Sequence, residues 1–127
     1  FSGRYSQRVF EALADTGVPR IHFVQGGAHL LAATAEFSCE VLSVDWRQPL
    51  SQVLEITGGR YALQGNMDPG VLRAPGPVIA QEVRAVMDSY GTGPGHIMNL
   101  GHGITPDVTV DAARAMVDTT QSYGASR

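Results

Sequence analysis

The sequence predicts an α/β fold in which parallel strands alternate with helices. Short stretches rich in β-branched and aromatic residues recur along the chain, and stretches with apolar residues at helical spacing lie between them. This alternation is typical of parallel βαβ units. The 127 residues suffice for one hydrophobic core, and no linker interrupts them. We therefore expect a single α/β domain over residues 1–127.

Four stretches are predicted to be strands because each is short and largely apolar or β-branched. In chain order they are residues 20–25, 41–46, 61–66 and 96–101.

Helices are predicted where apolar residues recur three or four positions apart. In chain order these positions are Tyr5, Val9 and Leu13; Leu50, Val53 and Leu54; Ile79, Val83, Val86 and Tyr90; and Ala113, Met116 and Val117. The alanine- and leucine-rich stretch Ala28–Phe37 is expected to form a further helix. Gly17, Gly58 and Gly91 follow three of these helices, as expected of helix ends, and Thr109 is a suitable N-cap for the last.

Polar residues gather at the carboxyl ends of the predicted strands. They are Gln25, Asp45, Gln64, Asn66, Asn99 and His102. Ligands of α/β proteins bind at this end of the strands, so the pattern indicates a shared site. The alternative is that these side chains cap helices and satisfy loop backbone.

Composition excludes several classes of function. A net charge of −3 and a pI near 5.7 argue against a nucleic-acid binder. No apolar stretch reaches the ~20 residues of a membrane-spanning helix. Cys39 is the single cysteine, which excludes an internal disulfide and favours a reducing, cytoplasmic compartment. All nine basic residues are arginine, which excludes lysine Schiff-base and P-loop chemistry.

Known catalytic and metal-binding motifs are absent from the sequence, including H-E-x-x-H, C-x-x-C and G-x-S-x-G. His96 and His102 lie about 20 Å apart if the strand is extended, so we expect no metal site there. His102 stands out because it lies between Gly101 and Gly103 directly after a predicted strand, where a ligand can approach closely. The alternative is a loop histidine flanked by turn glycines.

The chain resembles the uroporphyrinogen decarboxylase family over essentially its whole length. The segments that carry the resemblance are 95–97 and 99–104 (Asn-Leu-Gly-His-Gly-Ile), together with 21–23, 44–47, 63–69 and 109–111. Members of this family are single-domain (β/α)₈ barrels of the TIM type. Such a barrel needs about 250 residues and eight strands. The resemblance therefore implies the C-terminal half of the barrel, about four β/α units.

The resemblance also implies an activity: decarboxylation of the four acetate side chains of uroporphyrinogen III to coproporphyrinogen III, in porphyrin and haem biosynthesis. Family members are carboxy-lyases that use no metal or organic cofactor, and most are homodimers. Of the family's site residues only His102 has a counterpart here, as a catalytic and substrate-binding residue. The arginine-rich loop, aspartate, tyrosine and serine of the family come from earlier strands, so the chain alone is expected to be inactive. Arg47 is the nearest substitute for the arginine-rich loop, and we expect it instead to order its own loop.

Two alternatives remain. Zinc-dependent, corrinoid-linked methyltransferases have similar barrels but use a His-x-Cys pair, and Val24 stands where that cysteine would follow His22. The second alternative is that the chain is a non-catalytic fragment of a barrel.

Whichever of these is correct, half a barrel leaves sheet edges and inward-facing side chains uncovered. The candidates for uncovered inward-facing side chains are Ile21, Phe23, Val44 and Leu63. The chain is therefore expected to associate with itself or with the N-terminal half of a barrel.

Overall fold

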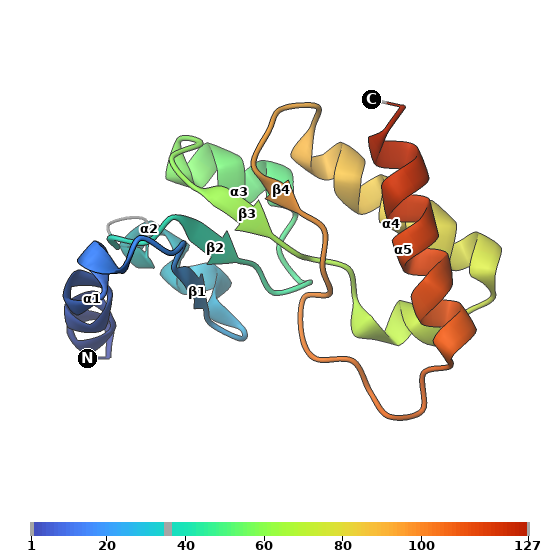
Figure 1. Ribbon diagram of the computed structural model, residues 1–127, viewed down its shortest axis with the longest axis horizontal. Coiled ribbons are helices and arrows are strands. Elements are labelled where there is room, and N and C mark those ends of the chain that lie inside the picture. The colour runs from blue at the N-terminus through green and yellow to red at the C-terminus, as the bar shows by residue number, and fades with distance from the viewer. Residues whose placement is uncertain (1, 35–36, 127) are drawn as a thin grey trace.

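Four short strands form one parallel sheet, in the order in which they occur in the chain (Figure 1). The computed structural model describes residues 2–34 and 37–126. The strands are β1 (Ile21–Phe23), β2 (Val41–Ser43), β3 (Ala62–Gln64) and β4 (His96–Ile97). The predicted parallel order is confirmed, although each strand is shorter than the apolar stretch that predicts it.

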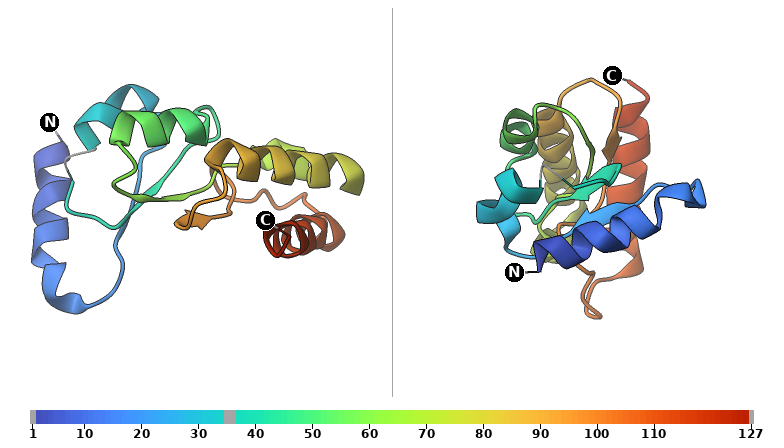
Figure 2. Two further views of the ribbon diagram at one scale, coloured as in Figure 1. Left: turned by 90° about the horizontal axis from the view of Figure 1, so that it is seen from above. Right: turned by 90° about the vertical axis from the view of Figure 1, so that its left-hand side faces the viewer.

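Helices precede, connect and follow the strands. The α-helices are α1 (Gly3–Ala12), α2 (Leu31–Thr34), α3 (Leu50–Thr57), α4 (Gly76–Tyr90) and α5 (Val110–Gly124). Three short 3₁₀ segments are η1 (Ala14–Thr16), η2 (Gly27–Leu30) and η3 (Pro69–Arg73). Figure 2 shows α2, α3 and α4 side by side on one side of the sheet, with α5 next to α4. This is the arrangement expected of half a β/α barrel.

The predicted helix over Ala28–Phe37 is wrong in extent. The structure has the 3₁₀ segment η2 and then only the four residues of α2, and residues 35–36 lie outside the described part of the chain. Most of this stretch is exposed, and Leu31 is one of the few side chains that pack against the core. Short helices depend on such packing, so alanine and leucine content alone does not extend this one.

The sheet register separates two rows of side chains. Phe23, Ser43, Gln64 and Ile97 are paired across the strands, and so are their neighbours His22, Leu42, Leu63 and His96. Successive side chains of a strand point to opposite faces, so the two rows lie on opposite faces of the sheet. We call the face that carries Phe23, Ser43 and Gln64 the open face.

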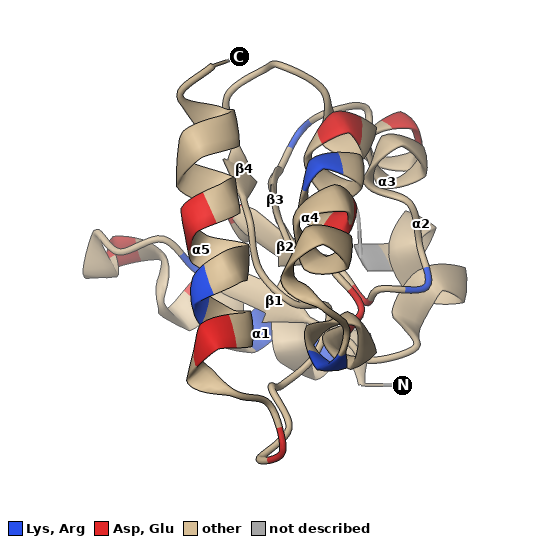
Figure 3. Cartoon of the chain, turned by 90° about the vertical axis from the view of Figure 1, so that its right-hand side faces the viewer, with Lys and Arg blue, Asp and Glu red and all other residues tan. Residues whose placement is uncertain are grey.

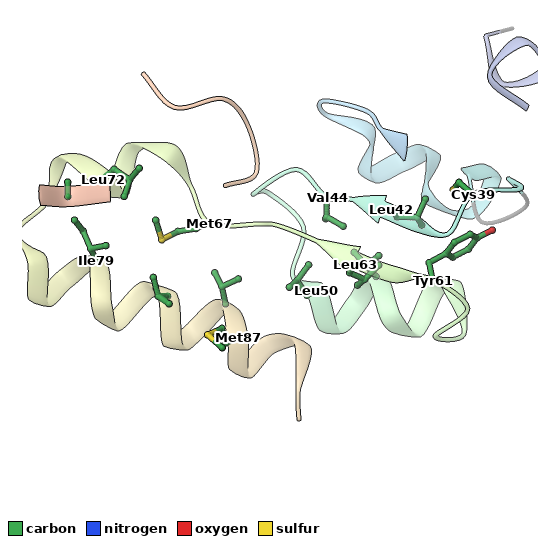
Figure 4. Packing of buried hydrophobic residues seen from close by; sticks show 14 residues of the cluster. Cys39, Leu42, Val44, Leu50, Tyr61, Leu63, Met67, Leu72, Ile79 and Met87 are labelled. Atoms are coloured by element: carbon green, nitrogen blue, oxygen red, sulfur yellow. The ribbon is translucent and has the colours of Figure 1, made fainter. Parts of the chain in front are cut away.

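The core lies between the sheet and the helices (Figure 4). Leu42 and Leu63 face Leu50 and Val53 of α3, and Ile79 and Val83 of α4 extend the same layer. Leu50, Val53, Leu63, Ile79 and Val83 are completely buried. The core therefore fixes the strands from one side and leaves the open face for function.

The expected set of inward-facing residues is half wrong. Ile21 and Phe23 are 46% and 42% exposed, as expected of an uncovered face. Val44 and Leu63 are instead buried, because they share the face of Leu42 and pack toward the helices.

The outer surfaces of α4 and α5 carry charges of both signs (Figure 3). Along α5, Asp111, Arg114 and Asp118 alternate in sign on the exposed side. The predicted N-cap of α5 is confirmed, since Thr109 Oγ1 accepts a hydrogen bond from the Ala112 backbone N–H at 3.2 Å. In the part of the chain that the structure describes, every helix is too short or too polar to cross a membrane.

Candidate functional site

Asp45 follows β2 and holds two loops together. Its carboxylate accepts hydrogen bonds from the backbone N–H groups of Gly26 (2.9 Å) and Arg47 (3.0 Å). Arg47 Nη1 adds two contacts at 2.9 and 2.8 Å. Burial raises the pKa of the Asp45 carboxyl, but these hydrogen bonds and the Arg47 charge outweigh it, so the pKa lies below its ordinary value. Asp45 therefore orders loops, and Arg47 orders its own loop as expected.

Asn66, at the end of the third predicted strand, has a similar structural role. It is buried, and its Nδ2 donates to the backbone carbonyls of Asp45 (3.0 Å) and Gln48 (2.5 Å). The alternative interpretation, that strand-end polar residues satisfy loop backbone, is therefore correct for Asp45 and Asn66. Sequence spacing alone does not distinguish these two from the exposed members of the set.

Of the other polar residues at the strand ends, three line a common recess and one lies outside it. Gln64 Nε2 donates to Ser43 Oγ at 3.1 Å on the open face, and Asn99 Oδ1 accepts from the Leu100 N–H at 2.8 Å. Gln64, Asn99 and His102 all line one recess, whereas Gln25 is exposed and lies outside it. The structure thus brings together three of the six predicted site residues.

This recess lies over the open face and has a volume of about 680 Å³. Ile21, Phe23 and Met98 form its apolar floor, and side chains of α5 border it. Its size and its mixture of apolar walls with a few polar groups fit a large organic ligand.

His102 is exposed at the edge of this recess. Its imidazole meets two aromatic rings edge-on: Phe23, with centroids 6.2 Å apart, and Trp46, with centroids 6.1 Å apart. Within the described residues, His102 forms no hydrogen bond or ion pair with protein groups. Both ring nitrogens are therefore available to a ligand, as donor or as acceptor.

Gly101 has a packing role that the sequence does not reveal. A Cβ atom at this position would lie 2.3 Å from the Trp46 backbone nitrogen and 2.8 Å from its Cα. The Gly101 N–H also donates to the Met67 carbonyl at 2.8 Å. Gly101 therefore permits close approach of the chain itself, whereas a Cβ at Gly103 would meet nothing within 4 Å.

Two other histidines belong to the opposite face of the sheet. His22 packs between Phe10 and Phe37, with centroids 5.4 and 4.8 Å away, and burial lowers its pKa. His96 stacks on Tyr90 at 4.8 Å, and its Nε2 lies 2.7 Å from the Gly65 carbonyl oxygen.

Cys39 is buried in the core layer, where burial raises the pKa of its thiol. Within residues 2–34 and 37–126, no three His, Cys, Asp or Glu side chains gather as metal ligands would. The grouping that distinguishes the site is therefore an exposed histidine beside aromatic rings.

Comparison with solved structures supports the half-barrel fold. A methyltransferase from Methanosarcina mazei superposes with a TM-score of 0.78 over 93% of this chain and 35% of its own, at 20% sequence identity. At this level of identity the likeness shows the fold.

Comparison of sequences shows the family. Curated uroporphyrinogen decarboxylases from Salinispora tropica and Streptomyces griseus are 49% and 46% identical over 89% and 88% of this chain. A third, from an Acidovorax species, is 42% identical over 99% of it. The chain spans 30% to 39% of the length of these relatives. The family model for uroporphyrinogen decarboxylase (URO-D) matches residues 1–123, and the chain belongs to this family.

Proposed function

We propose that this chain supplies part of the active site of a uroporphyrinogen decarboxylase, a carboxy-lyase of porphyrin biosynthesis. The observation that carries the proposal is the position of His102, whose ring nitrogens are unengaged at the edge of a large recess on the open face. Family membership supports the same substrate class. The substrate is a large macrocycle with many carboxylates, which suits a wide recess with an apolar floor.

The proposed reaction removes each acetate carboxylate as CO₂ and replaces it with a proton. Protonation of a pyrrole carbon turns the ring into an electron sink, so the electrons of the breaking carbon–carboxylate bond flow into the ring. The resulting methylene carbon then takes up a proton, and the ring proton is released. The pyrrole itself stores the electrons, so the proposed reaction needs no metal or organic cofactor.

His102 is proposed to bind a substrate carboxylate or to deliver a proton. An imidazole can donate a ring N–H to a carboxylate, and it can also carry a proton to a substrate carbon. The recess near His102 is otherwise lined by neutral side chains, including Gln64, Asn99 and Phe23. Among the described residues that line this recess, His102 is thus the one that can transfer a proton.

The chain alone is proposed to be inactive and to associate. Ile21 and Phe23 are exposed on the open face, and the predicted apolar stripe of α1 (Tyr5, Val9 and Leu13) is also 42% to 56% exposed. Covering apolar surface is favourable by about 25 cal/mol per Å². A remaining barrel segment or a second copy would provide this cover. A cytoplasmic homodimer is the proposed form of the complete enzyme.

A zinc- and corrinoid-linked methyltransferase is the alternative, supported by the structural likeness to a methyltransferase. The residues favour it less. His22 lies between two phenylalanines on the helix side of the sheet, and Val24 takes the place of the expected cysteine. Cys39 is in the core layer and does not line the recess of His102.

A chimaera tests the proposed function. The segment of the Salinispora tropica relative that matches this chain is replaced by residues 1–127, and formation of coproporphyrinogen from uroporphyrinogen is measured. The unaltered relative is the positive control, and the isolated 127-residue chain is the expected inactive control. A folded chimaera that turns over uroporphyrinogen supports the proposal. A folded chimaera without turnover contradicts it.

A further inference from the structure

We infer that Trp46, supported by Arg47, is a positioning residue that fixes the orientation of the His102 imidazole. The inference concerns the same site as the proposed function and rests on it for its catalytic consequence.

The first observation is the environment of the imidazole. Trp46 meets it edge-on, with an interplanar angle of 84°, and Phe23 also meets it edge-on, at 62°. Protein hydrogen bonds, which orient many catalytic histidines, are absent here among the described residues. Ring contacts are therefore what orients His102.

The second observation is that Trp46 is itself held. The Arg47 guanidinium carbon lies 3.9 Å from the centroid of the Trp46 ring, in cation–π geometry. The buried Asp45 carboxylate holds that guanidinium through Nη1 at 2.9 and 2.8 Å. A continuous series of contacts thus runs from Asp45 through Arg47 and Trp46 to His102.

The third observation concerns the backbone. Gly101 packs so closely on the Trp46 backbone that no Cβ fits between them. The residue before His102 is therefore fixed to the same tryptophan whose ring contacts the imidazole. Both the backbone and the ring of His102 take their position from Trp46.

We infer that Arg47 affects His102 by holding the Trp46 ring. The alternative is that Arg47 binds a carboxylate of the ligand directly. Its guanidinium borders a separate recess of about 230 Å³ that Asp68 and Glu82 also line. Its charge is already matched by Asp45. Two further carboxylates make that recess unfavourable for an acidic ligand.

NMR on the 127-residue chain tests the positioning directly. With isotope-labelled histidine, we expect nuclear Overhauser contacts between the His102 and Trp46 rings and a rigid His102 ring on the nanosecond timescale. Trp46→Leu should make the His102 ring mobile, whereas Trp46→Phe should keep the His102 ring largely ordered. Arg47→Gln should increase the mobility of the His102 ring although the Trp46 indole is still present. Arg60→Gln is the matched control, because Arg60 lies over the ring of its neighbour Tyr61 at 5.8 Å, outside the recess of His102. A His102 ring as mobile in the native chain as in Trp46→Leu overturns the inference.

Kinetics of the chimaera test the catalytic consequence. Small misplacements of a catalytic group are costly, so Trp46→Leu should lower kcat about tenfold with KM changed less than about twofold. In a His102→Asn background the same substitution should have almost no further effect, because the two residues act as one unit. Equal effects of Trp46→Leu with and without His102 overturn the inference. An inactive chimaera whose His102 ring is still ordered by Trp46 contradicts the proposed function and leaves the positioning supported.

Discussion

Arg73 and Asp107 form a two-point ion pair that ties η3 to the loop between His102 and α5. Arg73 Nε donates to Asp107 Oδ2 at 2.5 Å, and Nη2 donates to Oδ1 at 3.2 Å. Nη2 also lies 3.3 Å from Thr105 Oγ1. The hydrogen bonds from Arg73, and then from Thr105, hold the pKa of Asp107 well below its ordinary range. The loop that follows the candidate site is therefore fastened to η3.

Removing this ion pair should loosen the loop. In Arg73→Gln we expect the backbone amides of residues 102–108 to exchange faster with solvent, by at most about fivefold because both partners are half-exposed. Arg114→Gln is the control, since its contact with Asp111 lies within α5. Unchanged exchange at residues 102–108 would show that other contacts fix the loop.

Truncation of a core residue should lower the free energy of unfolding more than truncation of a residue on the open face. Leu63→Ala removes a completely buried side chain and should lower the free energy of unfolding by about 2–5 kcal/mol. Ile21→Ala, at a position 46% exposed, should cost less than about 1 kcal/mol. Urea denaturation measures both. Similar losses would place Ile21 and Leu63 in the same environment and contradict the register of the sheet.

The pair between Arg20 and Glu40 predicts an acid-sensitive component of stability. Hydrogen bonds from the Arg20 side chain, and then from its backbone, lower the pKa of Glu40 to about 2. A carboxyl whose pKa is lower in the folded than in the unfolded chain stabilises above the unfolded pKa of about 4.3. That contribution is lost as the pH falls from about 4 to about 2. Glu40→Gln should therefore lose less stability over this interval than the native chain, as measured by urea midpoints at several pH values. A steeper loss in Glu40→Gln would contradict the assignment.

The open face should drive association of the isolated chain. Phe23→Ser removes an apolar ring that is 42% exposed and should raise the dissociation constant measured by sedimentation. Ile56→Ser on α3, at a position 47% exposed on the helix side, is the matched control and should change it little. If the native chain sediments as a monomer at micromolar concentration, the open face does not drive association.

The order of strands and helices can be predicted from the sequence because the pattern that indicates each element lies within that element. The β-branched stretches and the apolar spacing of α3, α4 and α5 are set by residues close together in the sequence. The face of each strand was less predictable, because β2 carries apolar residues on both faces and alternation alone does not say which is covered. The expected inward direction of Val44, directly after β2, is wrong for this reason. In β3, Leu63 is the one large apolar residue, and a single such residue does not show which side of the sheet is covered.

The candidate site was predictable only in part. His102 stands in a distinctive glycine-flanked segment, so the sequence singles it out. Trp46 was missed because it is 56 positions away in the sequence, and only the pairing of strands brings the two together. Asp and Asn side chains commonly bind nearby loop backbone, as Asp45 binds the Arg47 N–H, but Asn99 shares this tendency and lines the recess, so the sequence does not separate the two roles.

We expect His102 to act in decarboxylation, and the variant His102→Asn in the chimaera tests this role. The measurement is the rate of CO₂ release from uroporphyrinogen, together with the distribution of partly decarboxylated products. We predict a lower rate or an altered order of acetate loss with the fold retained, because asparagine keeps a polar side chain but loses the titratable ring. Unchanged rates and an unchanged product distribution would contradict the claim and make His102 a loop residue.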